Sequence, residues 1–262
     1  MTRHIDTHCH LYQPYFEDDE ISELLESIED QSITCFIVTE SINDFKKLLP
    51  YKLTHHKLFV GLHPFQNGAS VSIETFMSSK SIIIDWISSH TAFGIGEIGL
   101  DFTPKTLNNP QLLDFHKDQQ IQVFREQLKI AIEFNVWVSV HSRQAGHYAI
   151  EILQDLKIKK VILHAFDGKY KYVQSAIKNN PTWFFSIPGS IKRDLKTQNM
   201  ARLLPISNLL IESDAPALGP LKNVKATPLD IIGTRDYIAE LKGMSKLEMD
   251  QAMELNHARL FI

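Results

Sequence analysis

The sequence of 262 residues contains only two cysteines, Cys9 and Cys35, which excludes a disulfide framework and is typical of a reducing compartment. It has no run of about 18 uncharged apolar residues, the length of a membrane span, because Asp85 divides the best candidate. Arg3 and Asp6 interrupt any early apolar run, so we expect no signal peptide. These absences predict a cytoplasmic protein, or a nuclear one if the source is a eukaryote, with no membrane partner.

An excess of either charge is also missing, since 27 basic residues and 31 acidic residues give a net charge of -4. A mildly acidic chain lacks the broad basic surface of a non-specific nucleic-acid binder, although bound metal ions can still create a local positive site. We find no low-complexity segment, internal repeat or long run of like charges. The 44% of hydrophobic residues are enough for a sizeable core.

Short apolar runs alternate with longer amphipathic stretches along the whole chain. Runs rich in Val, Ile and Phe predict eight strands, over residues 4–10, 34–40, 57–63, 92–101, 137–143, 160–167, 183–188 and 208–214. Apolar residues at helical spacing predict helices over 18–30, 73–89, 116–134, 145–156, 171–179, 195–204, 228–242 and 245–260.

The strand runs are apolar at both parities, as expected for parallel strands that are covered on both faces. Eight strands alternating with helices predict an α/β fold, a TIM-type (β/α)₈ barrel, with residues 1–262 as a single domain. An open doubly wound sheet also alternates in this way. However, no G-x-G-x-x-G follows a strand and no G-x-x-x-x-G-K-[ST] is present, so the usual nucleotide-binding motifs of that alternative are missing.

Two histidines, His8 and His10, stand at i and i+2 in the first run. Alternate residues of a strand share a face, so we expect both imidazoles to point the same way and one divalent ion to fit between them. Cys9 would then point to the opposite face, as a packing residue.

The C-terminal ends of the other runs carry His63, Glu97, His141, His164 and Asp214. In a closed barrel these ends meet at one face, where the active sites of this fold are built. A single histidine at a strand end is more often a hydrogen-bonded structural residue. The joint occurrence of histidines and carboxylates at five strand ends favours a metal site instead.

Two ions suit this set better than one, because it contains six ligands: His8, His10, Glu97, His141, His164 and Asp214. Imidazole together with carboxylate suits Zn and related divalent metals, and Mg and Mn also bind such mixed sites. Glu97 is the natural bridge. Two ions would favour an anionic group such as phosphate and would generate a bound hydroxide, with Asp214 accepting the proton.

The motifs D-x-H-x-H, G-L-H-P, G-E-I-G-L-D, V-H-S-R, H-A-F-D-G and E-S-D-A-P follow one another in this order. This set resembles the TatD family of metal-dependent deoxyribonucleases, in the amidohydrolase superfamily, over nearly the whole chain. The segments 184–191 and 217–220 look most like the third TatD-domain paralogue of eukaryotes. The resemblance implies a DNA substrate, with 3′→5′ exonuclease action or incision at abasic sites, and no obligate protein partner is evident.

The resemblance also implies roles for residues. One ion would be held by His8, His10, Glu97 and Asp214, and the second by Glu97, His141 and His164. His63 and Arg143 would contact the phosphate, for which the planar guanidinium is well suited. Glu212 shares a strand face with Asp214 and would support catalysis or a third ion.

Departures from the family pattern concern the sixth motif above all, where Ala165 and Asp167 stand at positions that are more often Cys and Ser or Thr. Asp167 adds a carboxylate near the site. Four aromatic residues are candidates for stacking on DNA bases: Phe65, Phe102, Phe166 and Tyr170. Each of them is at least as readily explained as a core or rim aromatic.

Two other functions stay open at this point. A small-molecule amidohydrolase would cleave a lactone, cyclic amide or phosphotriester. Members that resemble phosphotriesterase bridge their metals with a modified lysine, whereas the fourth strand here offers Glu97 and no lysine. A non-enzymatic binding protein on the same barrel is less compatible with a complete ligand set.

Overall fold

The computed structural model describes residues 3–262 apart from residues 67, 105 and 107–111. The chain divides into two compact units. The first unit comprises Met1–Ile37, Lys52–Lys57 and Phe184–Ile262, and the second comprises Val38–Tyr51 and Leu58–Trp183. Strands and helices alternate in both units.

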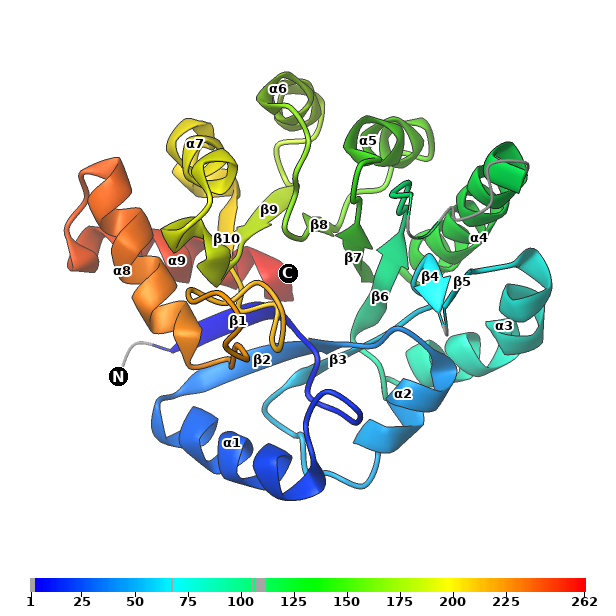
Figure 1. Cartoon of the computed structure of the whole chain (residues 1–262), viewed down its shortest axis with the longest axis horizontal. Coiled ribbons are helices and arrows are strands. Elements are labelled where there is room, and N and C mark those ends of the chain that lie inside the picture. The colour runs from blue at the N-terminus through cyan, green and yellow to red at the C-terminus, as the bar shows by residue number, and fades with distance from the viewer. Residues whose placement is uncertain (1–2, 67, 105, 107–111) are drawn as a thin grey trace. The chain divides into compact units, whose positions relative to one another are not determined.

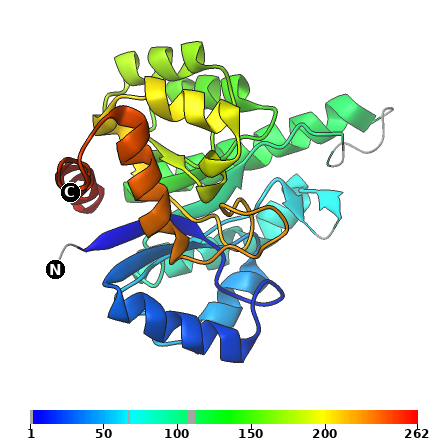
Figure 2. The same cartoon turned by 60° about the vertical axis from the view of Figure 1, so that its left-hand side comes forward.

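The first unit contains parallel strand pairs. They are formed by β1 (His4–Cys9) with β2 (Ile33–Val38), and by β9 (Phe184–Ile187) with β10 (Leu209–Ile211). The blue strands β1 and β2 run side by side in Figure 2. The helices of this unit are α1 (Asp18–Asp30), α7 (Leu195–Leu203), α8 (Asp230–Lys242) and α9 (Lys246–Ala258). Short 3₁₀ turns cover Gly189–Lys192, Ile206–Asn208 and Arg259–Phe261.

The second unit contains a parallel sheet in the order β3-β6-β7-β8. Its strands are β3 (Lys57–Val60), β6 (Gly94–Gly99), β7 (Trp137–His141) and β8 (Val161–Leu163). The helices are α2 (Ile42–Leu48), α3 (Ile73–Ser88), α4 (Leu113–Phe134), α5 (Gly146–Asp155) and α6 (Tyr170–Asn179). Figure 1 shows α4, α5 and α6 on one side of β6, β7 and β8. Among the described helices, none is long and apolar enough to cross a membrane.

The strands are covered on both faces. Every residue of β2 and of β6 is buried, which confirms the expectation drawn from apolar residues at both parities. In the second unit Phe59, Phe76 and Phe124 are fully buried. Burial of each such side chain contributes about 1.5–3 kcal/mol to the stability of the fold relative to an exposed side chain. This packing holds the strands, and the residues at their ends, in place.

Each of the eight predicted strand runs contains a strand, and each predicted helix is present, so the alternation is confirmed. The strands end earlier than the runs do, because β8 stops at Leu163 and β10 at Ile211. Ala165 and Asp214 then have φ values of 40° and 50°, in the left-handed region, where a strand ladder cannot continue. The polar side chains that follow β8 and β10 therefore stand on turns.

Two elements were missed by the sequence patterns. Helix α2 begins after Ser41, whose hydroxyl accepts the Asp44 N–H at 3.2 Å, and this residue type favours helix starts. The antiparallel pair of β4 (Phe65–Gln66) and β5 (Ala69–Ser70) was also not predicted. Both elements are too short for apolar periodicity to reveal.

Candidate metal centre

The first-unit cluster consists of His8, His10 and Asp214. His8 lies in β1, His10 follows β1 directly, and Asp214 follows β10. The Nε2 atoms of both histidines lie 3.7 Å from the same carboxylate oxygen, Oδ1 of Asp214. All three residues are buried. The two imidazoles therefore share a face, as the i, i+2 spacing predicts.

Backbone hydrogen bonds fix the first-unit cluster. The N–H of His10 donates to the carbonyl of Ala215 at 2.8 Å, and the N–H of Asp214 donates to the carbonyl of His8 at 2.9 Å. A hydrogen bond of 3.0 Å joins His10 Nδ1 to the Tyr12 hydroxyl. An imidazole held through one nitrogen presents the other in a fixed direction, so Tyr12 orients Nε2 of His10.

Asp6 stabilises the first-unit cluster through hydrogen bonds and was not predicted as a site residue. Its Oδ1 accepts N–H bonds from Ser213 at 2.9 Å and from His8 at 3.2 Å, and its Oδ2 accepts the Ser213 hydroxyl at 2.6 Å. Burial raises the pKa of Asp6 to about 7, although the hydrogen bonds from Ser213 and His8 act in the opposite direction. Asp6 thus ties the end of β1 to the segment that carries Asp214.

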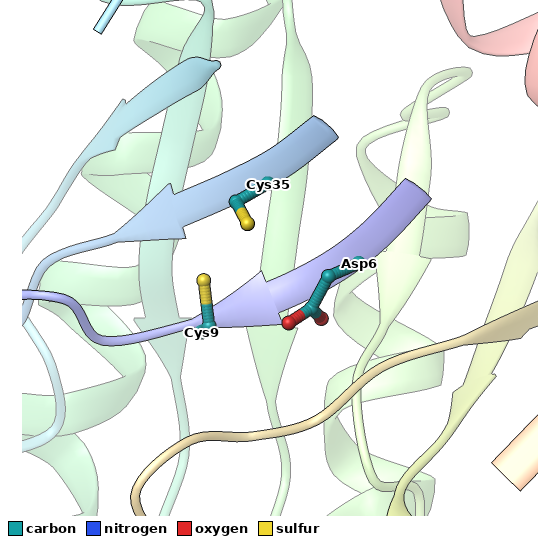
Figure 3. A group of neighbouring side chains, drawn as sticks. All are labelled: Asp6, Cys9 and Cys35. Carbon is teal, nitrogen blue, oxygen red and sulfur yellow. The ribbon is translucent and has the colours of Figure 1, made fainter. Parts of the chain in front are cut away.

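The side chains of Asp6 and Cys9 on β1 and of Cys35 on β2 form a third group, with one carboxylate oxygen and the two sulfur atoms within 4.8 Å of one another (Figure 3). Both cysteines are fully buried and free. Burial, the largest cause, raises the pKa of each thiol, so neither is held as the thiolate that metals require. Asp6 already accepts three hydrogen bonds. This group therefore fits core packing, as expected for Cys9.

The second-unit cluster consists of His63, Glu97, His141 and His164. Oε1 of Glu97 lies 2.7 Å from His141 Nδ1, 2.8 Å from His164 Nε2 and 3.6 Å from His63 Nε2. His141 Nδ1 and His164 Nε2 are 3.3 Å apart. Glu97 is 3% exposed. One carboxylate oxygen thus faces three imidazoles, and His63, predicted as a phosphate contact, lies among the ligand atoms.

Neighbouring backbone positions Glu97 and His141. The N–H of Glu97 donates to the carbonyl of Thr39 at 2.9 Å. Gly99, at the end of β6, has a φ of 144°, and a Cβ atom there would lie 1.9 Å from the carbonyl oxygen of His141. Only glycine permits this close approach of β6 to β7.

Asp101 connects the second-unit cluster to Arg143. It accepts hydrogen bonds from Arg143 Nε at 3.1 Å and Nη2 at 2.7 Å, and its Oδ2 lies 3.6 Å from His141 Nε2. Burial would raise the pKa of Asp101, but the neighbouring imidazole of His141 and the hydrogen bonds from Thr103 outweigh it and hold that pKa well below its ordinary value. Burial would likewise lower the pKa of His141, but Asp101 and Glu97 raise it. The sequence motifs contain Asp101 without indicating this role.

Arg143 keeps access to solvent, since its side chain is 53% exposed. Its proposed phosphate contact stays a prediction. Glu212 is fully buried, and its charge is one of the smaller causes that raise the pKa of Asp6. Its catalytic or third-ion role also stays a prediction. Asp167 is exposed, and its Oδ2 accepts the Gln144 N–H at 3.4 Å.

The four predicted stacking residues have different surroundings. Phe65, Phe102 and Tyr170 are half-buried. Phe166 is only 7% exposed, and its ring atoms lie within 2.8 Å of where Cβ atoms on Gly146 and Gly168 would stand. Its ring therefore packs against these two glycines and leaves little surface for a base, while the stacking roles themselves stay predictions.

The donor atoms suit divalent ions in type and spacing. A tetrahedral zinc ion with bonds of about 2.1 Å holds its ligand atoms about 3.4 Å apart. The imidazole nitrogens of His141 and His164 are 3.3 Å apart, and both histidines of the first-unit cluster lie 3.7 Å from Asp214. Glu97 Oε1 is closer to the imidazoles of His141 and His164, at the hydrogen-bond distances of 2.7 and 2.8 Å, so an ion bound there would replace these hydrogen bonds. Burial keeps competing water away. Each cluster therefore fits a metal ion.

Comparisons with known proteins agree over the length of the chain. The family model described as TatD related DNase matches residues 5–262. The chain is 33% identical to the human deoxyribonuclease TATDN3, over 98% of this chain and 94% of that protein. YabD of Bacillus subtilis, described as an uncharacterized metal-dependent hydrolase, is 26% identical over 98% of both chains.

Solved structures share the fold. YjjV, a TatD homologue from Escherichia coli, has a TM-score of 0.79 at 22% identity and covers 99% of this chain and 98% of that one. A TatD family hydrolase from Entamoeba histolytica has a TM-score of 0.78 at 19% identity, with the same coverage. This likeness confirms the TIM-type barrel fold predicted from the alternation of strands and helices.

Proposed function

Since the chain belongs to the TatD related DNase family, we propose that it hydrolyses phosphodiester bonds of DNA with two divalent metal ions. Family membership confirms the predicted class, a metal-dependent hydrolase acting on ester bonds, and the resemblance to the third TatD-domain paralogue. The observation that carries the proposal is the convergence of three imidazoles on one oxygen of Glu97.

One ion would be held by His8, His10 and Asp214, and the other by Glu97, His141 and His164. That Glu97 also binds the ion of the first-unit cluster stays a prediction from the family pattern. When bound, such ions lower the pKa of a coordinated water and offset the charge of the phosphate. The identity of the metal is left open among Zn, Mn and Mg, because imidazole with carboxylate accommodates all three.

The protein side chains supply the remaining chemistry. We propose that Asp214 accepts the proton of the attacking water, because its carboxylate has a second oxygen in addition to Oδ1, which faces His8 and His10. Arg143 would bind a phosphate oxygen through N–H groups that Asp101 leaves available, and Asp101 would hold the guanidinium in place. His63 would either ligate a metal or contact the phosphate.

Two DNA substrates test the position of cleavage, and a panel of small molecules tests the alternative function. Single-stranded DNA labelled at its 5′ end gives a ladder of shortened products if the enzyme is a 3′→5′ exonuclease. A duplex with one abasic site gives a single incision product if it acts there. A panel of lactones and cyclic amides, with DNA left intact, would identify a small-molecule amidohydrolase instead.

Three variants test the assignment of the metal centre. Glu97→Gln and His141→Ala are expected to lose most DNA cleavage and to carry less metal by mass spectrometry. His90→Ala changes an exposed histidine after α3 and serves as the matched control, with unchanged metal content. Wild-type cleavage and metal content in His141→Ala would contradict the proposed centre.

The proposed function also concerns the cellular location of the protein and its partners. The free thiols of Cys9 and Cys35 suit a reducing compartment, and we propose a cytoplasmic or nuclear location. We propose that DNA is the macromolecular partner, and that no obligate protein partner is needed. Native mass spectrometry of active fractions tests the last point.

A further inference from the structure

A row of aromatic rings with a cation at each end lies in the second unit. The ring centroids of Phe102 and Tyr148 are 5.4 Å apart, those of Tyr148 and His147 are 3.9 Å apart, and those of His147 and Tyr172 are 5.5 Å apart. Lys117 Nζ lies 5.6 Å from the centre of the Phe102 ring, and Lys171 Nζ lies 4.9 Å from that of Tyr172. We call these six residues the aromatic row.

The fold places the aromatic row at the same edge of the sheet as the second-unit cluster. Phe102 follows β6, His147 and Tyr148 lie in the first turn of α5, and Tyr172 lies in the first turn of α6. The strands β6, β7 and β8 are parallel neighbours, so the segments that follow them share one edge. The N–H of Phe102 also donates to the carbonyl of Arg143 at 3.1 Å.

Part of the aromatic row is accessible. Tyr148 is 42% exposed, and His147 and Tyr172 are half-buried with their rings inclined by only 24°. An exposed ring with further rings behind it offers a π-face to a planar ligand. Stacking of a base on an aromatic side chain contributes about 1–3 kcal/mol and tolerates any base, because every base has a π-face.

Charge around the aromatic row suits a polyanion. Lys117 and Lys171 stand at its two ends, and Arg143, whose backbone carbonyl accepts the N–H of Phe102, has a half-exposed side chain. The exposed carboxylate of Asp167, also in this region, accepts the N–H of Gln144. Lysines beside aromatic rings are the combination that single-stranded nucleic-acid binders use to hold phosphates and bases together.

We infer that the aromatic row binds a single-stranded segment of the DNA substrate and leads it to the second-unit cluster. Bases stack on Tyr148 and Tyr172, and the lysines pair with phosphates. Duplex DNA keeps its bases stacked on one another and cannot use these rings in the same way. The inference rests on the proposed function and extends it to the form of DNA that is bound.

Fluorescence anisotropy with the full chain tests the inference. The probe is a fluorescein-labelled oligothymidylate of twelve nucleotides, added to metal-free protein so that no cleavage occurs. Tyr148→Ala and Tyr172→Ala each remove a ring on which one base stacks, so each is expected to raise the Kd of the oligonucleotide by about 5- to 150-fold. Tyr148→Phe keeps the ring and should bind within about twofold of wild type, because its π-face is unchanged.

Tyr237→Ala, at a half-buried tyrosine of α8 in the first unit, is the matched control and should leave Kd unchanged. If the wild type cleaves DNA but both alanine variants bind the oligonucleotide like wild type, the inference is overturned and the proposed function stands. An equal loss of binding in Tyr148→Phe and Tyr148→Ala would also overturn it. A wild type that cleaves no DNA when metal-loaded refutes the proposed function itself.

Discussion

Replacing Asp6 is expected to weaken the ion of the first-unit cluster without touching a metal ligand. Asp6 accepts three hydrogen bonds, from Ser213 N–H, His8 N–H and the Ser213 hydroxyl, and is completely buried. In Asp6→Ala these three donors lose their acceptor, at about 1–3 kcal/mol each, or about 3–9 kcal/mol together. This is a large share of the stability of a typical domain, so that variant is expected to unfold.

Asp6→Asn is the informative variant. Its remaining oxygen still accepts the two N–H bonds, and its amide group faces the Ser213 hydroxyl, so we expect a loss of only about 1–2 kcal/mol of unfolding free energy. Residues that orient metal ligands typically change metal affinity by about 10- to 100-fold. We therefore expect the first-unit ion to bind that much more weakly and the second-unit ion to bind as in wild type.

Isothermal titration of the metal-free protein with Zn²⁺ at pH 8, with a competing chelator, measures both affinities, and urea unfolding measures the stability. Asp194→Asn is the control, because Asp194 caps α7 with hydrogen bonds from the Lys196 and Thr197 N–H groups. It should cost less than about 1 kcal/mol of stability, because Asn caps a helix about as well as Asp, and no metal affinity. Two wild-type affinities in Asp6→Asn, or an equal loss of both, would refute the positioning role.

Three further changes test other parts of the structure. Burial lowers the pKa of His257 from 6.5 to about 4, so its contribution to stability is fully present above pH 6.5 and is lost as pH falls from 6.5 to 4, where only the unfolded chain binds the proton. His257→Gln should remove about 3 kcal/mol of the pH dependence seen in urea unfolding of the metal-free protein. An unchanged slope would contradict the assignment. Asp101→Asn should weaken the second-unit ion about 10- to 100-fold in the same titration, because His141 loses its orienting carboxylate, whereas affinity within twofold of wild type would exclude that role. Gly99→Ala should destabilise the fold by about 3 kcal/mol or more, because the added methyl group would overlap the carbonyl oxygen of His141. An unchanged Tm would contradict this prediction, because it would show that the backbone relaxes freely around the added methyl group.

The strands were predictable because parallel strands covered on both faces appear in the sequence as apolar runs. The run 94–99 is buried throughout and consists of glycine and isoleucine apart from Glu97, whose carboxylate is buried against the imidazoles of the second-unit cluster. Strand ends were less predictable. His164 and Asp214 lie on turns rather than in the strands, because pairing stops before them.

The metal ligands could be predicted from their positions at strand ends, whereas the residues that hold them could not. Asp6 and Ser213 are 207 residues apart, and Arg143, which follows β7, bonds to Asp101, which follows β6. Such contacts depend on the pairing of distant segments, which local patterns do not contain. The same reason explains Phe166, a candidate for stacking in the sequence that the fold packs against Gly146 and Gly168.

The central claim is that two buried clusters hold separate metal ions that are both needed for DNA cleavage. Equilibrium metal content, measured by mass spectrometry beside cleavage of single-stranded DNA, tests it most directly in wild type, Asp214→Asn and His164→Ala. We predict two ions in the wild type, one in each variant, and loss of cleavage in both variants. Wild-type metal content in either variant, or full cleavage with one ion, would contradict the claim.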